Sequence, residues 1–279
     1  MDKLYNDVAF KISRLVTREY STSFSVAVSF LEPESRQAIN SIYGFVRYSD
    51  EIVDTFHSVD KRKVLELFEN EYYAASERGV STNPILHAFQ LMVKKYHIND
   101  ELIQGFLKSM KYDLNKSTCT SREEMNEYIY GSADVVGLMC LRVFVDGDET
   151  LYNQLKTPAM KLGSAFQKIN FLRDIKNDTE VLKRRYFPEF SDTILSDGMK
   201  EKIITDIKND FAESYKGIQL LPGRSRLAVT IAYYYYKTLL AKIQHKPAEQ
   251  IMTMRVRISD FRKFLLFLKA YLAYFLNLI

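Results

Sequence analysis

The sequence predicts an all-α protein that forms a single domain over residues 1–279. Glycine (10 residues) and proline (6 residues) are scarce for this length, so few positions can break a helix or form a tight turn. Between these breakers, apolar residues recur at spacings of three and four, and no stretch alternates as a strand would. No low-complexity linker divides the chain, and 47% of its residues are hydrophobic, enough for one sizeable core.

The expected helices follow one another with short connections. The first covers about 5–29, and the second begins near Glu34, directly after Pro33, and ends near His57. The others are expected near residues 61–78, 84–96, 99–114, 122–145, 151–178, 199–220, 224–244 and 258–278. Many of them exceed the average helix length of about 11–12 residues, which favours a bundle of long helices.

Composition excludes several classes of function. The net charge is only +4 and the two signs are interspersed, so no nucleic-acid partner is expected. Cys119 and Cys140 form no disulfide framework or CxxC motif, and the four histidines are scattered, which argues against a transition-metal site. The first residues, MDKLYNDVAF, lack the features of a secretory signal, so a cytoplasmic location is expected.

A stripe of polar side chains follows one face of the second expected helix. The segment SIYGFVRYSDEIVD (41–54) places Tyr43, Arg47, Asp50 and Asp54 within about 60° of one line along a helix. The neighbouring stripe is apolar, as a core-facing helix requires. Two aspartates at i and i+4 repel each other, so they stabilise nothing by themselves.

A second stripe of the same design lies in FQKINFLRDIKND (166–178). Gln167, Asn170, Asp174 and Asp178 fall within about 80° of one line, again beside apolar residues. One DxxxD pair usually marks a solvated helix face. Two such pairs, each with a neighbouring arginine, favour a functional role instead.

The chemistry that suits this pattern is the binding of a diphosphate through Mg²⁺. Mg²⁺ takes oxygen ligands and is often bound by one or two carboxylates together with phosphate oxygens. Two facing helices of this kind can hold ions that neutralise a departing diphosphate. Arg47 and Arg173 can donate charge-assisted hydrogen bonds to the same oxygens. The alternative for each arginine is an intrahelical salt bridge to a neighbouring aspartate.

The aromatic content fits such a reaction. Loss of diphosphate from an allylic substrate leaves a carbocation, which needs a dry, apolar and aromatic pocket. The chain has 19 tyrosines and 18 phenylalanines but no tryptophan. Aromatic residues at helical spacing are also ordinary core, and at most two tyrosines of IAYYYYKTLL (231–240) can share a face.

The C-terminal segment 261–279 is strongly apolar but contains Arg262, Lys263 and Lys269. Its longest uncharged run is ten residues, about half the length that crosses a bilayer. It is expected to be either the last helix of the bundle or a helix that docks on a membrane surface.

Five regions of the sequence match motifs of one known family. They are STSF (21–24), YGFVRYSDEIVD (43–54), YIYGSADVVGLM (128–139), FQKINFLRDIKND (166–178) with RRYFP (184–188), and MRVRIS (254–259). Together they cover nearly the whole chain, which resembles the head-to-head trans-isoprenyl diphosphate synthases, that is, the squalene and phytoene synthases. The resemblance implies a single isoprenoid synthase-type helical bundle around a central cavity.

The resemblance also implies roles for individual residues. The implied ligands of two or three Mg²⁺ ions, with Mn²⁺ as a substitute, are Asp50, Asp54, Asn170, Asp174 and Asp178. The implied diphosphate-binding and channel residues are Ser21, Ser23, Tyr43, Arg47, Gln167, Arg173 and Arg184. Tyr130 is expected near the reacting carbons, and with the four aspartates it completes the implied catalytic set.

Three adjoining features are less specific. Lys183, Arg184 and Arg185 either close over the diphosphate or form a solvated basic loop. Gly131 and Gly137 either let the helix kink or serve close packing. The chain departs from the family pattern at Asn177, where an acid is frequent, and at Lys183, where the flap often opens with glycine.

The reaction implied is head-to-head condensation of two geranylgeranyl diphosphates to phytoene via prephytoene diphosphate. YGFVRYSDEIVDTFH (43–57) and GSADVVGLM (131–139) most resemble the bacterial phytoene synthases, so NADPH is not expected. The alternatives are a squalene or dehydrosqualene synthase that uses farnesyl diphosphate, and a non-catalytic prenyl-lipid-binding or assembly-factor relative. A hydrocarbon product implies transient contact with the inner face of a membrane. The oligomeric state is left open.

Overall fold

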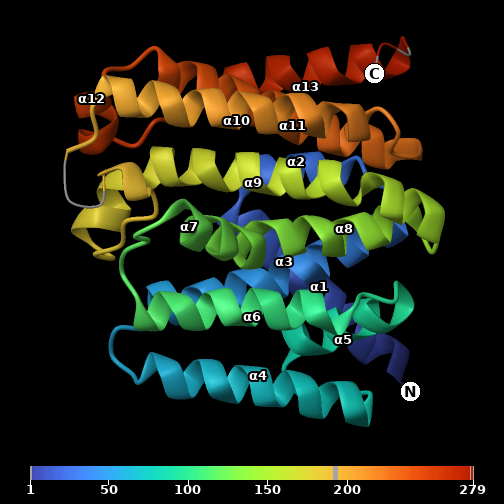
Figure 1. The fold of residues 1–279 in the computed structure, drawn as a ribbon. Helices are drawn as coiled ribbons and strands as arrows, with labels where there is room; N and C mark the ends of the chain where they lie inside the picture. Colours follow the sequence, from blue (N-terminus) through green and yellow to red (C-terminus); the bar gives the residue numbers. More distant parts are fainter. Residues whose placement is uncertain (1, 191–193, 277, 279) are drawn as a thin grey trace.

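The computed structural model describes residues 2–190, 194–276 and 278, and these residues form helices without any strand (Figure 1). The first half of the chain contains α1 (Asp2–Tyr20), α2 (Thr22–Ser29), α3 (Pro33–Asp54), α4 (Lys61–Arg78), α5 (Pro84–Lys95), α6 (Asp100–Asn115) and α7 (Arg122–Ile129). The second half contains a π-helical segment η1 (Tyr130–Asp134), α8 (Val135–Val145), α9 (Glu149–Glu180), a 3₁₀ turn η2 (Pro188–Phe190), α10 (Asp197–Ile218), α11 (Gly223–Gln244), α12 (Ala248–Thr253) and α13 (Asp260–Phe275). The predicted all-α fold is confirmed.

The expected helix over 5–29 is in fact two helices, because the chain breaks at Ser21. This residue is extended, with φ −147° and ψ 93°, and its Oγ accepts a hydrogen bond from the amide of Phe24 at 3.4 Å. Serine is a favoured N-cap because its oxygen satisfies an amide at the free end of a helix. The STSF motif therefore starts α2 instead of continuing α1.

The expected helix over 122–145 is continuous in direction but widens at η1. A Cβ added to Gly131 would lie 2.7 Å from the carbonyl oxygen of Gly105 and 2.8 Å from Cβ of Ser109. Only a glycine allows η1 to approach α6 this closely, which supports the packing role for Gly131. This stretch is long and apolar enough to cross a membrane, but 61% of its most apolar window is buried in the bundle, as in a core helix.

The longest helix, α9, passes through Pro158 without ending there. The proline ring lies against α10, where a Cβ added to Gly217 would be only 2.3 Å from Cβ of Pro158. The absence of a side chain at position 217 therefore lets α10 pack closely along α9.

Two hydrophobic cores flank a central cavity. One core lies among α3, α5, α6 and α8, where Phe45 stacks on Phe89 with ring centroids 4.0 Å apart. The other lies among α7, α9, α10 and α11. Between them is a cavity of about 1020 Å³ whose walls come from α2, α3, α8, α9, α11 and α13. Helices α13 and α4 form opposite edges of the molecule (Figure 1).

Candidate active site

The two acidic stripes lie on helices that face each other at one end of the bundle. Asp50 and Asp54 are in the last turns of α3, and Asp178 is in the last turn of α9. Arg184 joins the two helices, since its Nη1 donates to Oδ1 of Asp54 at 2.7 Å and its backbone amide donates to the carbonyl of Asp178 at 2.7 Å. Arg184 therefore connects the acidic end of α3 to the acidic end of α9.

Several carboxyl groups gather at this end of the bundle and affect one another's pKa. Burial raises the pKa of Asp50 to about 7, and the nearby Asp54 adds to the effect. Burial likewise raises the pKa of Asp178 to about 7, with further contributions from Asp174 and Asp54. Carboxylates held this close to one another are suited to a divalent cation, which would relieve their repulsion.

The side-chain oxygens at this site fit Mg²⁺ ions that would also be coordinated by phosphate oxygens of a substrate. The oxygens of Asp50, Asp54, Asn170, Asp174 and Asp178 are hard ligands of the kind this ion prefers. Among the residues that the structure describes, no three histidine, cysteine or acidic side chains converge into a preformed metal site. Mg²⁺ needs only one or two carboxylates per ion when phosphate oxygens and waters complete its shell.

Asp113 of α6 is a fifth acid at the site, and it was not expected. Its side chain is 5% exposed and lies 3.6 Å from Nη1 of Arg184. The hydroxyl of Tyr128 donates to it at 2.7 Å, and that of Tyr186 at 3.4 Å. Burial raises the pKa of Asp113 to about 6 despite these contacts. A lone acid on a helix forms no spacing pattern, so only its neighbours in space reveal its role.

The flap after α9 is fixed to the segment before α7. The amide of Cys119 donates to the carbonyl of Arg185 at 2.9 Å, and the amide of Arg185 donates to the carbonyl of Ser117 at 2.7 Å. Arg184 is buried, so it is not part of a solvated loop, whereas Lys183 is exposed. Lys183 has φ 57°, a left-handed conformation that favours glycine, so the lysine at this position adopts a backbone geometry that glycine adopts more readily.

Arg47 interacts locally on α3. It forms an ion pair with Glu51, lies 4.0 Å from Asp50, and places its guanidinium 4.5 Å from the ring centroid of Tyr20. The structure thus shows a local ion pair for Arg47, and a role in binding diphosphate stays a prediction.

Arg173 also pairs with its neighbour, since its Nε donates to Asp174 at 3.1 Å, but it lines the cavity as well. A second arginine reaches the same carboxylate from a distant part of the chain. Nε of Arg255, between α12 and α13, lies 2.7 Å from Oδ1 of Asp174. Arg255 belongs to the MRVRIS motif, but the sequence indicated no role for it.

The cavity is polar where it meets the acidic helices and apolar beyond. Its polar end is lined by Ser21, Ser23, Tyr43, Gln167, Asn170 and Arg173. The hydroxyl of Tyr236 donates to Oδ1 of Asn170 at 3.2 Å, and the Tyr236 ring stacks on Phe166 with centroids 3.9 Å apart. Tyr235 and Tyr236 line the cavity whereas Tyr233 is buried in the core, in line with the limit of two tyrosines on one face.

The structure does not bring Tyr130 into this cavity. The side chain is 39% exposed and lies beside Gly105 of α6. Ser132 and Ala133, from the same π-helical segment, line the cavity instead. The structure thus places the Tyr130 side chain outside the cavity lining, and its expected role next to the reacting carbons stays a prediction.

Comparison with known proteins identifies relatives over most of the chain. Residues 17–262 match the family model for squalene/phytoene synthase. Phytoene synthase 2, chloroplastic, from Oryza sativa subsp. japonica is 27% identical over 90% of this chain and 67% of its own length. The chloroplastic phytoene synthase of an Oncidium hybrid cultivar is 28% identical over 89% of this chain and 64% of its own length. The chain thus spans about two thirds of the length of these relatives.

Solved structures share the fold. A dehydrosqualene synthase in complex with ligand superposes with a TM-score of 0.84 at 21% identity, covering 99% of both chains. Squalene synthase HpnC from Alicyclobacillus acidocaldarius superposes with a TM-score of 0.74 at 23% identity, covering 86% of this chain and 95% of that one. With the sequence match over residues 17–262, these findings show that the chain belongs to the squalene/phytoene synthase family.

Proposed function

We propose that this protein condenses two geranylgeranyl diphosphates head to head and forms phytoene via prephytoene diphosphate. The observation that carries the proposal is that two acidic helix ends, joined by Arg184, lie next to a large apolar cavity. The four aspartates do not line the cavity themselves, but Arg173 and Arg255 line it and pair with Asp174. A charged diphosphate and a long hydrocarbon tail need these two environments side by side. The family supports the class of reaction, and the chloroplastic phytoene synthases among the relatives favour this substrate.

The polar end holds and orients the diphosphate. Arg173 and Arg255 lie at the cavity and pair with Asp174, so both can turn to phosphate oxygens when substrate enters. Bound Mg²⁺, held by the aspartates and Asn170, would supply positive charge that stabilises diphosphate as it leaves. Arg184, which is buried between the two helices, keeps their carboxylates in register.

The apolar part protects the cationic stage of the reaction. The stacked rings of Phe166 and Tyr236 belong to the cavity wall, as do Phe24 and Tyr43, whose centroids lie 5.1 Å apart. Aromatic faces attract a cation within about 6 Å, and dry walls keep water from trapping it. These residues direct the carbocation toward the double bond of the second substrate.

The size of the cavity favours long substrates. Its volume of about 1020 Å³ is at the upper limit of ordinary small-molecule pockets, which span roughly 300–1,000 Å³. The apolar walls continue from Tyr43 as far as Phe144 and Leu221. Farnesyl diphosphate, as in a squalene or dehydrosqualene synthase, is the second candidate because the fold closely matches a dehydrosqualene synthase.

Incubation of the purified protein with labelled geranylgeranyl diphosphate and Mg²⁺, with and without NADPH, tests the proposal. We expect a C40 triene that forms without NADPH. A C30 product formed only from farnesyl diphosphate would refute the proposed substrate and select the second candidate. No product from either substrate, together with binding of both, would indicate a non-catalytic relative.

Two substitutions test the metal ligands. Asp50→Ala and Asp174→Ala should each nearly abolish turnover while the circular dichroism spectrum stays unchanged, because each removes a charge that a divalent ion needs. The matched control is Glu180→Ala, which removes an exposed carboxylate from the end of α9, off the acidic stripe. Rates near wild type in both aspartate variants would contradict the metal assignment.

A further inference from the structure

The exposed side of α13 is mainly apolar, with Arg262 and Lys269 exposed among the apolar side chains. Its exposed side chains include Phe261 and Phe275, which are 73% and 74% exposed. The full set of large apolar residues exposed on this helix is Phe261, Phe264, Leu265, Leu268, Tyr271, Leu272 and Phe275, and Leu276 follows directly. A soluble protein rarely exposes so large a contiguous apolar patch unless it binds something there.

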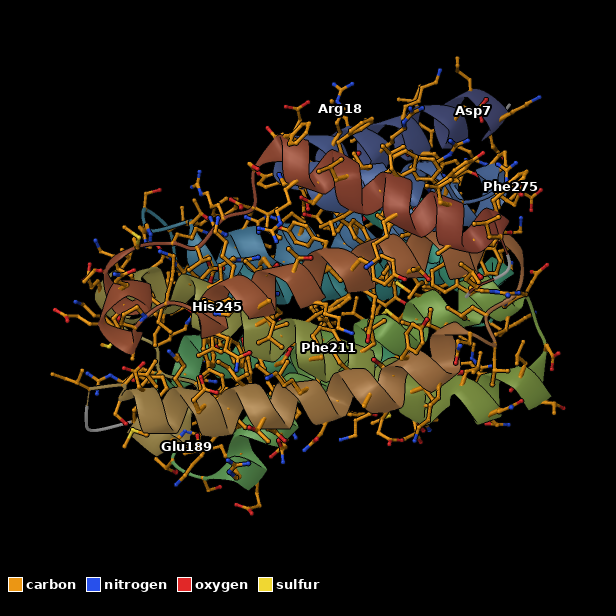
Figure 2. All side chains as sticks on the ribbon, turned by 90° about the horizontal axis from the view of Figure 1, so that it is seen from above. Asp7, Arg18, Glu189, Phe211, His245 and Phe275 are labelled. Atoms are coloured by element: carbon orange, nitrogen blue, oxygen red, sulfur yellow. The ribbon has the colours of Figure 1, made fainter. Side chains whose placement is uncertain are left out.

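The rest of the described chain leaves this face without a partner. The opposite stripe of α13 packs on the bundle, where Ala270 is fully buried and Phe267 stacks on Phe30 at 4.7 Å. In Figure 2, which is seen from this side, no other described helix lies over α13, and Phe275 marks its C-terminal end. The helix is therefore mainly apolar on both its packed and its free side, whereas a surface helix normally turns a polar face outward.

The excess of basic residues lies in the C-terminal segment that contains α13. The last 26 residues contain five basic residues and one acidic residue, and the remaining chain contains 34 of each sign. The net charge of +4 therefore belongs entirely to this segment. The five basic residues are Arg255, Arg257, Arg262, Lys263 and Lys269. Arg255 pairs with Asp174 at the acidic cluster, whereas Arg262, Lys263 and Lys269 lie on α13 itself. Basic residues next to an exposed apolar helix are complementary to an anionic lipid surface.

The apolar face also continues into the cavity. Phe264 of α13 is exposed on the surface and lines the cavity, and so does Val26 of α2. Lys263 of α13 lines the cavity too. On the other edge of α13, Tyr234 and Leu268 line a shallow groove of about 540 Å³, with Lys269 placed 5.0 Å from the Tyr234 ring.

We propose that α13 lies on the surface of an anionic lipid bilayer and that the cavity opens toward lipid at this helix. The helix has 16 residues, so it is about 24 Å long, shorter than the roughly 30 Å hydrocarbon core that it would have to cross. It therefore lies in the interface, with its aromatic and leucine side chains in the acyl region. The use of this opening by a hydrocarbon product rests on the proposed function, whereas the docking itself does not.

Flotation with liposomes tests the docking surface. The wild-type protein should float with equimolar phosphatidylglycerol–phosphatidylcholine vesicles, and the variant Leu268→Glu/Leu272→Glu should bind at least ~10-fold more weakly because two charges enter the apolar face. Leu67→Glu is the matched control, since Leu67 is 67% exposed but lies on α4 at the opposite edge of the molecule (Figure 1). It should float like the wild type.

A second variant separates charge from apolar contact. Arg262→Gln/Lys269→Gln should weaken binding to the anionic vesicles and leave binding to pure phosphatidylcholine vesicles unchanged. All variants should keep the wild-type circular dichroism spectrum and the wild-type turnover in detergent. Equal flotation of wild type and the Leu268/Leu272 variant would overturn the proposal.

Other occupants give distinct results. If the wild type is a dimer, the Leu268→Glu/Leu272→Glu variant is a monomer and neither protein floats, the lipid proposal is overturned. The face would then bind a second copy of this chain. Flotation requires no substrate, so an inactive protein that floats would refute the proposed function and support the docking surface.

Discussion

Replacement of Arg184 by glutamine should lower the free energy of unfolding of the metal-free protein by about 3 kcal/mol. Arg184 is buried and is the cation shared by Asp54 and Asp113. Its removal leaves an acid inside the protein without its positive partner. The same substitution should weaken the link between α3 and α9, which Arg184 connects.

The magnitude follows from the exposure of the two partners. Breaking a buried pair usually costs roughly 3–5 kcal/mol. Asp113 is buried, so the loss of its contact with Arg184 is costly. The cost is at the low end, about 2.5 kcal/mol, because Asp113 has a pKa of about 6 and can take up a proton, and because Tyr128 still donates a hydrogen bond to it. Asp54 has a side chain that is 37% exposed, so its ion pair adds only about 0.5 kcal/mol.

Urea unfolding at pH 7, followed by circular dichroism in the presence of EDTA, measures this effect. Lys183→Gln is the matched control, because it removes an exposed charge from the adjacent residue and should change stability by less than about 0.5 kcal/mol. Addition of Mg²⁺ should reduce the deficit of the Arg184 variant, since the ion replaces part of the lost positive charge. An unchanged urea midpoint in EDTA would refute this account of the acidic cluster.

Three further predictions concern single positions. Burial raises the pKa of Asp134 to about 7, so the folded protein keeps a proton that the unfolded chain releases near pH 4, and the free energy of unfolding should fall as the pH rises from about 4 to 7. Asp134→Asn should flatten this part of the pH profile of unfolding, and an unaltered profile would count against the prediction. Gly217→Ala should destabilise the protein by about 1–3 kcal/mol through its clash with the proline ring of α9, whereas Gly198→Ala, with no atom closer than 3.9 Å, should be neutral or stabilising in the same thermal melt. Tyr130→Phe should keep turnover within about threefold of wild type, because the side chain lies outside the cavity; a loss of ~10²–10⁴-fold would instead indicate proton transfer by its hydroxyl.

The helices could be predicted from the sequence because their signals are local. Apolar spacing, Pro33 at the start of α3 and the rarity of glycine identified the long helices to within a few residues. The break at Ser21 was missed because an N-cap in the middle of an apolar run leaves the spacing unchanged. The π-helical segment was missed because it depends on the contact of Gly131 with α6.

Part of the site was also determined by the sequence, namely the two carboxylate pairs and the polar residues one turn before them. Their spacing along each helix is set by the 3.6-residue turn, so no tertiary information is needed to place them on one face. Only the tertiary structure decided that the two faces meet, and that Arg184, Asp113 and Arg255 join them. These residues come from separate segments of the chain. The structure was likewise needed to show that Tyr130 lies outside the cavity lining and that α13 has an exposed apolar face. A linear sequence records which side chains share a helix, whereas contacts between helices arise from packing, which brings together residues that no spacing rule connects.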